Sequence, residues 1–113
     1  MPPLRYDVVH RLKVDFPALT FVSNGGLTQA VDIEAQLQFV DGVMLGREAY
    51  HHPWGLARWD SQFFGAAPRE LDRADIELKM VEYMEMLTAQ GITWTHAARH
   101  MLGLWNGEAG ARR

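Results

Sequence analysis

Two short apolar runs in the first half of the chain each end in a turn that contains glycine. Leu19 to Ser23 is followed by Asn24-Gly25-Gly26, and Val43 to Leu45 is followed by Gly46-Arg47. Glycine lets the backbone approach a ligand closely, and free N–H groups at the start of a following helix attract phosphate. Arginine adds a planar, permanently charged donor beside the second turn. These residue types therefore predict an anion site, and a phosphate site in particular.

A segment of helical length, residues 28–39, lies between the two runs and positions the turns. Thr28 is suited to cap this helix. A strand, a helix and a strand in this order form parallel neighbours. In (β/α)8 barrels, the loops after the last two strands are a recurrent phosphate site. Two turns one βα unit apart therefore favour one shared phosphate over two ordinary tight turns. The apolar positions of the helix include Val31, Ala35, Leu37 and Phe39.

Further helical patterns flank this unit in the first 65 residues. An N-terminal helix with Val8, Val9 and Leu12 on one side is predicted to end before Pro17. Apolar residues at helical spacing between Glu48 and Phe64 predict one or two short helices broken at a proline. Two parallel strands leave edges and faces uncovered, so we expect a larger protein or a second copy to cover the sheet.

The small residues from Gly65 to Pro68 form the best candidate for a domain boundary. A long helix is expected from about Leu71 to Gln90, with Gly91 as its stop. Thr93 or Thr95 is expected to cap a last helix that ends at Asn106-Gly107. The predicted division is thus an α/β part over residues 1–65 and a helical part over residues 66–113.

The composition excludes several classes of protein. A chain of 113 residues with 48% hydrophobic and 22% charged residues has a globular composition, and it is long enough for one domain but too short for two well-packed ones. The net charge of −3 leaves any nucleic-acid contact to a local basic patch. Without cysteine there is no disulfide, thiolate nucleophile or cysteine metal cluster. No apolar run approaches membrane-spanning length, so we expect a soluble, cytoplasmic protein.

The C-terminal region carries the only local basic cluster, formed by Arg99 and the Arg112-Arg113 tail. Trp94 and Trp105 lie near it, so the cluster has the residue types that meet phosphates and bases. A solubilising end with tryptophans in the core is the alternative. His96 and His100 are spaced to share a metal, but no carboxylate stands in register, and we expect no metal site.

No catalytic constellation stands out in the sequence. It has no Ser/His/Asp arrangement and no paired-carboxylate pattern. A phosphate-gripping end without a reactive centre is typical of a site for a cofactor's tail.

Several stretches resemble the tRNA-dihydrouridine synthases, and most closely the bacterial A subfamily. They are Pro3 to Val9, the strand ending in Asn24-Gly25-Gly26, Asp41 to Tyr50, and Arg99 to Leu104 through Gly110-Ala111-Arg112. The match runs nearly end to end in the family's order. Asn-Gly-Gly is shared by many flavin barrels, whereas the helical Arg-His-Met-Leu-Gly-Leu segment is more specific.

This resemblance implies the last two parallel strands of an FMN-dependent (β/α)8 TIM barrel, followed by a small helical tRNA-binding domain. Such enzymes reduce a D-loop uridine of tRNA with NADPH as the reductant. Asn24, Gly25 and Gly26 would hold the FMN phosphate, with Gly46 and Arg47 completing the grip. Arg112 would contact tRNA, and His96, Arg99 and Arg113 are lesser candidates for the same surface.

The resemblance also implies what is absent. Met1 aligns just before the family's seventh strand, so the catalytic residues belong to an N-terminal part outside this sequence. The isolated chain is therefore expected to be inactive. Two alternatives are a stand-alone RNA-binding module and a fragment of another phosphate-binding flavin barrel.

Overall fold

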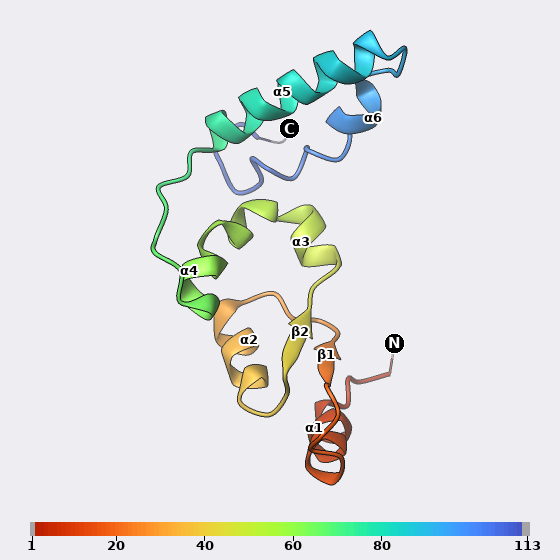
Figure 1. Ribbon diagram of the computed structural model, residues 1–113, viewed down its shortest axis with the longest axis vertical. Helices are drawn as coiled ribbons and strands as arrows, with labels where there is room; N and C mark the ends of the chain where they lie inside the picture. The colour runs from red at the N-terminus through yellow and green to blue at the C-terminus, as the bar shows by residue number, and fades with distance from the viewer. Residues whose placement is uncertain (1, 112–113) are drawn as a thin grey trace. The chain divides into compact units, whose positions relative to one another are not determined.

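The two predicted strands lie side by side and run in parallel (Figure 1). Strand β1 spans Val22–Asn24 and strand β2 spans Gly42–Met44, with Asn24 opposite Met44. This confirms the parallel strand–helix–strand unit. The first strand starts later than predicted because Phe21 pairs differently. Its N–H donates to Asp41 Oδ2 and its carbonyl accepts from the Asp41 N–H.

The computed structural model describes residues 2–111, and the chain divides into two compact units, Met1–Glu48 and Ala49–Arg113. The first unit contains α1 (Tyr6–Asp15), β1, α2 (Ala30–Leu37) and β2. Helix α1 ends two residues before Pro17, as predicted. The division at residue 65 into a barrel part and a tRNA-binding part stays a prediction.

Helix α2 corrects two predictions. Gln29, not Thr28, occupies its N-terminal cap position, and the carbonyl of Gln29 accepts from the Ile33 N–H at 3.1 Å. Its inward residues are Ile33 and Gln36, whereas Val31 and Phe39 are exposed. The helix buries only one narrow face, and the apolar pattern does not identify it because a glutamine occupies part of that face. The buried apolar residues of this unit are Leu27, Ile33 and Val40.

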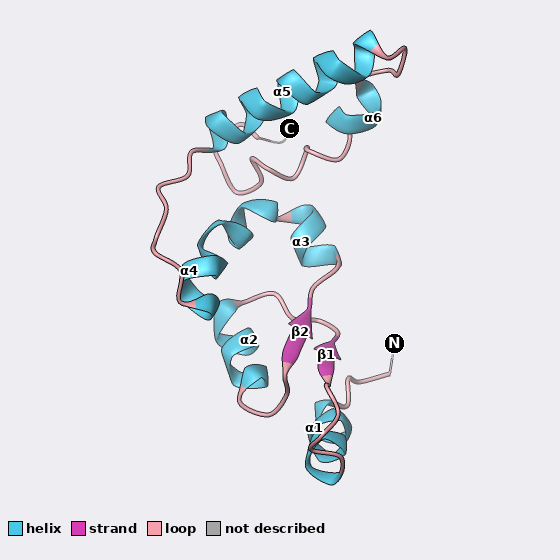
Figure 2. Cartoon of the chain, in the orientation of Figure 1, coloured by secondary structure: helices cyan, strands magenta, loops and turns pink. Residues whose placement is uncertain are grey.

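The second unit is helical (Figure 2). Three short elements follow β2, and the break at Pro53 is as predicted. They are α3 (Arg47–His51), which starts in the first unit, the 3-10 helix η1 (Pro53–Arg58) and α4 (Trp59–Phe64). No helix among the described residues is long and apolar enough to cross a membrane.

The long helix α5 (Arg73–Ala89) forms within the predicted range. Asp72 caps its start by accepting from the Ala74 N–H at 2.9 Å. At its end, Gly91 adopts a φ of +79°, and the Ile92 N–H donates to the Leu87 carbonyl. This left-handed glycine is the predicted stop.

The last predicted helix is much shorter than expected. Helix α6 covers only Thr95–Ala98, and Trp94, not a threonine, precedes it at the cap position. Residues 99–111 continue as successive turns, with hydrogen bonds such as Leu104 N–H to Met101 carbonyl. Gly103 lies against the carbonyls of Tyr50 and His51, so a side chain at this position would collide with backbone.

Candidate functional site

The two glycine turns leave the same edge of the sheet. Asn24 and Met44 are register partners in parallel strands, so the turns begin one strand spacing apart, roughly 4.8 Å. Gly25 has a φ of +126° and Gly26 a φ of +64°, conformations that favour glycine. The predicted site residues of the two turns are therefore brought together on adjacent strand ends.

Leu4 and Tyr6 support the first turn from one side. The Tyr6 hydroxyl donates a hydrogen bond to the Gly25 carbonyl. A Cβ built on Gly25 or on Gly26 would lie 2.9 Å from a Leu4 methyl group. Neither the type nor the spacing of these two residues predicts a role in the site. Their only signal was that they lie within the Pro3 to Val9 stretch that carries the family resemblance.

The second turn is open. A Cβ built on Gly46 would meet no atom within 4 Å. Arg47 is exposed at the start of α3, and no ion pair joins it to the rest of residues 2–111. The N–H groups of Gly26 and Gly46 donate no backbone hydrogen bond within that same range. Free donors, an open glycine face and an exposed guanidinium together fit a phosphate group.

The first glycine turn does not lead directly into a helix, contrary to the prediction. Helix α2 begins at Ala30, so the first turn is separated from the helix start by residues 27–29. The N-terminus of α2 therefore does not follow the glycines directly, and the first turn offers its own N–H groups rather than those of a helix. The side chain of Asn24 is exposed at the strand end.

A buried polar network lies under the first turn. Ser23, which is fully buried, donates to Gln36 Oε1 at 3.3 Å. His10 Nε2 lies 2.8 Å from the same oxygen, and its ring stacks on Phe39 at 4.3 Å. The network joins α1, β1 and α2, so it fixes the strand that carries Asn24.

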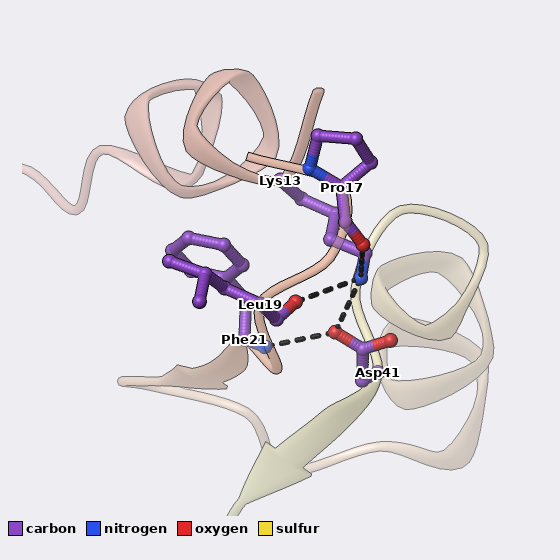
Figure 3. A network of polar contacts seen from close by, with 5 residues as sticks. All are labelled: Lys13, Pro17, Leu19, Phe21 and Asp41. Carbon is purple, nitrogen blue, oxygen red and sulfur yellow. Dashed lines mark hydrogen bonds and ion pairs between the residues drawn. The ribbon is translucent and has the colours of Figure 1, made fainter. Parts of the chain in front are cut away.

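A second polar network lies where the two strands begin, at the end of the sheet away from the glycine turns (Figure 3). Lys13 Nζ lies 3.0 Å from Asp41 Oδ2 and donates to the carbonyls of Pro17 and Leu19. The Phe21 N–H, and after it the Lys13 ammonium, hold the pKa of Asp41 below its usual value. The loop between α1 and β1 is thereby tied to the start of β2.

The predicted RNA-contacting residues lie in the second unit. Arg99 and His96 are exposed, one at the C-terminal end of α6 and the other within it. Arg112 and Arg113 lie outside the described residues. His100 lies beyond α6, and its Nδ1 is 2.9 Å from the Tyr50 hydroxyl. No group of three potential metal ligands occurs within residues 2–111.

Trp94 and Trp105, which lie near the predicted basic cluster in sequence, have different environments. Trp105 packs with the guanidinium of Arg73, which lies 5.7 Å from its ring and 4.7 Å from that of Trp54. Arg73 also donates to the Leu104 carbonyl and pairs with Glu108 at 2.5 Å. Trp94 is 53% exposed, so it is not a core residue.

With this geometry in place, comparison with known families identifies the class of protein. All residues, 1–113, match the protein family described as "Dihydrouridine synthase (Dus)". The chain therefore belongs to the dihydrouridine synthase family, a family of oxidoreductases, as the resemblance indicated.

Individual relatives agree with this assignment. The chain is 48% identical to a tRNA-dihydrouridine(20/20a) synthase of Pseudomonas aeruginosa over 113 residues, which is 100% of this chain and 34% of that protein. It is 49% identical to the synthase of the same name in Pseudomonas syringae pv. tomato, again over 34% of that protein. Identity to the Escherichia coli K12 synthase is 44%, over 33% of its length. The chain spans about a third of the length of the curated relatives it matches.

Proposed function

We propose that this chain is the C-terminal part of an FMN-dependent tRNA-dihydrouridine synthase, acting in the cytoplasm. The observation that carries the proposal is the match of all 113 residues to the dihydrouridine synthase family. The relatives' names specify positions 20 and 20a of tRNA, and the proposed substrate is a uridine of the D loop at these positions. NADPH is the proposed reductant.

The proposed role of the glycine turns is to bind the phosphate end of FMN. Gly26 and Gly46 supply N–H donors with no backbone partner in residues 2–111, and Arg47 supplies a charged donor that can meet two phosphate oxygens. Asn24 and Gly25 shape the first turn. A bound flavin supplies the hydride chemistry, and these residues bind and orient its tail.

The reacting end of the cofactor is proposed to lie outside these 113 residues. The described site contains glycines, an asparagine and an arginine, and none of these is a general acid or base near neutral pH. The chain is therefore proposed to be inactive alone and to need the remaining two thirds of such an enzyme.

The second unit is proposed to bind tRNA. Arg99 and His96 are exposed there, and Arg112 and Arg113 extend the same basic region in sequence. A local basic patch is what an acidic protein of net charge −3 needs to bind tRNA.

A reconstitution experiment tests this function. The chain is combined, by co-expression, with the N-terminal two thirds of the Pseudomonas aeruginosa relative, and dihydrouridine in tRNA is measured with FMN and NADPH. We expect reduction by the combined parts and none by either part alone. Activity of the isolated chain would contradict the proposed inactivity, and failure of a well-folded combination would contradict the functional assignment.

Gly46→Ala provides a matched test of the phosphate site in the reconstituted enzyme. The added methyl group meets no protein atom within 4 Å, so folding is expected to be unaffected. It occupies open space in the turn proposed to bind the phosphate, so flavin affinity is expected to fall by roughly tenfold, or about 1.4 kcal/mol. Unchanged flavin affinity would remove this turn from the site.

A further inference from the structure

Three polar side chains on one face of helix α1 contact different parts of the first unit. Tyr6, His10 and Lys13 have the spacing i, i+4 and i+7, which places them on the same face of the helix. Lys13 pairs with Asp41 where the strands begin, and His10 Nε2 lies 2.8 Å from Gln36 Oε1 within the buried polar network. Tyr6 contacts the opposite end of the sheet, where the first glycine turn follows β1. The position of Tyr6 is thus set by a helix that is anchored at two other places.

The contact of Tyr6 fixes one peptide group of the first turn. Its hydroxyl donates a hydrogen bond to the Gly25 carbonyl. That carbonyl and the Gly26 N–H belong to the same peptide group, which is planar and trans, so the two bonds point in opposite directions. Because the carbonyl is held toward Tyr6, the Gly26 N–H points away from it. Gly26 is exposed, and its N–H donates no backbone hydrogen bond within residues 2–111.

Without the hydroxyl, the same peptide group could turn over easily. It is flanked by two glycines, so no Cβ opposes rotation about the bonds on either side of it. Leu4 packs against both glycines, but its methyl groups form no hydrogen bond that distinguishes the carbonyl from the N–H. A reversed peptide group would present a carbonyl oxygen in place of the Gly26 N–H, and this oxygen would repel a phosphate.

We propose that Tyr6 is a positioning residue that makes the site select a phosphorylated flavin over an unphosphorylated one. It acts through the peptide group between Gly25 and Gly26, because it keeps the N–H donor directed outward before the ligand arrives. Gly46 and Arg47 follow the adjacent strand end and are the proposed partners of the same phosphate. This role rests on the proposed function, in which the glycine turns bind the phosphate end of FMN.

The test compares FMN with riboflavin, which lacks the phosphate. It uses this chain co-expressed with the N-terminal two thirds of the Pseudomonas aeruginosa relative and freed of bound flavin, and the quenching of flavin fluorescence measures both affinities. Tyr6→Phe removes the hydroxyl and keeps the aromatic ring. We expect this variant to bind FMN roughly three- to tenfold more weakly, the effect of one hydrogen bond, and to bind riboflavin as the wild type does.

Tyr83→Phe is the matched control. It also removes a hydroxyl from a tyrosine, at an exposed position of α5, and should change neither affinity. A variant that is only less well folded has a smaller binding-competent fraction, which weakens both flavins by the same factor. The ratio of the FMN and riboflavin affinities therefore separates positioning of the peptide group from stabilisation of the fold.

The outcomes also separate the role of Tyr6 from the proposed function. If Tyr6→Phe weakens both flavins equally, the hydroxyl only stabilises the fold. If it weakens neither, the turn keeps its conformation without the hydroxyl. Either result would overturn the role of Tyr6 while the proposed function stands. If the wild-type combination binds FMN no more tightly than riboflavin, the phosphate site itself is wrong, and the role of Tyr6 with it.

Discussion

At the scale of single residues, the glycines of the candidate phosphate site have two different reasons to be glycine. Gly25 and Gly26 have positive φ values, so a side chain there is strained whatever the space around it. Gly46 has no such constraint and faces open space. The first turn thus requires glycine for its backbone conformation. In the second turn a side chain would contact no other part of the protein, and it would obstruct only a bound ligand.

This difference predicts a contrast in stability. Gly25→Ala is expected to lower the free energy of unfolding by about 1 to 3 kcal/mol, since a φ of +126° is rarely accessible to alanine. The collision with Leu4 adds little, because that side chain is half exposed and can move. Gly46→Ala is the matched control, with no expected loss. Urea denaturation of both variants measures this, and equal stabilities would contradict the strain argument.

At the scale of elements, the Lys13–Asp41 network decides how α1, β1 and β2 are joined. One carboxylate oxygen accepts from both the Phe21 N–H and the Lys13 ammonium, while that ammonium also binds two loop carbonyls. Each element here is short, and a strand of three residues has few ladder bonds of its own. Side-chain bonds therefore replace part of the missing ladder.

This network predicts a pH dependence of stability. Because the pKa of Asp41 is lower in the folded than in the unfolded chain, its contribution is present above the unfolded value, near pH 4, and is lost as the pH falls through the folded value. Asp41→Asn should therefore destabilise the chain at pH 7, and the difference from wild type should shrink below about pH 4. Chemical denaturation midpoints at several pH values measure it.

Asp15→Asn is the control for this prediction. Asp15 pairs with Arg11 one helical turn away, and both side chains lie largely in solvent, so the pair contributes little. A pH profile of Asp41→Asn that runs parallel to the wild type would mean that the network does not stabilise the fold.

The elements that could be predicted from sequence are those with local causes. The stop of α5 follows from a left-handed Gly91, and the break at Pro53 follows from proline. The parallel unit follows from the apolar runs and their turns. The early end of α6 at Ala98 could not be predicted, because apolar residues keep helical spacing through Trp105 although the structure forms turns there.

The residues of the candidate site also include some that the sequence predicts and some that it does not. The glycines and Arg47 can be identified in the sequence because they directly follow two short apolar runs that lie one βα unit apart. The Tyr6 hydroxyl on Gly25 and the contact of Tyr50 with His100 depend on tertiary contacts over 19 and 50 residues, which periodicity does not reveal.

At the scale of the whole molecule, exposed apolar side chains are the dominant feature. In the first unit Val14 is 73% exposed, and Phe16, Leu19 and Val22 are each more than half exposed. Val22 lies on β1, which pairs with β2 on one side only among the described strands. Soluble monomers rarely leave so many large apolar residues and a strand edge open together.

We therefore expect the isolated chain to self-associate as its concentration rises. Sedimentation velocity across a concentration series measures this.

A variant with Val14→Lys, Phe16→Glu and Leu19→Lys should stay monomeric to higher concentration, because these exposed positions can carry charge without unfolding the core. A variant with Thr28→Lys, Gln29→Lys and Gln38→Glu, which changes the net charge by the same amount at exposed polar positions, is the control. If the wild type is monomeric throughout, the apolar surface does not drive association. If the wild type associates but the N-terminal part of the Pseudomonas aeruginosa relative suppresses this, the same surface is the one that the rest of such an enzyme covers.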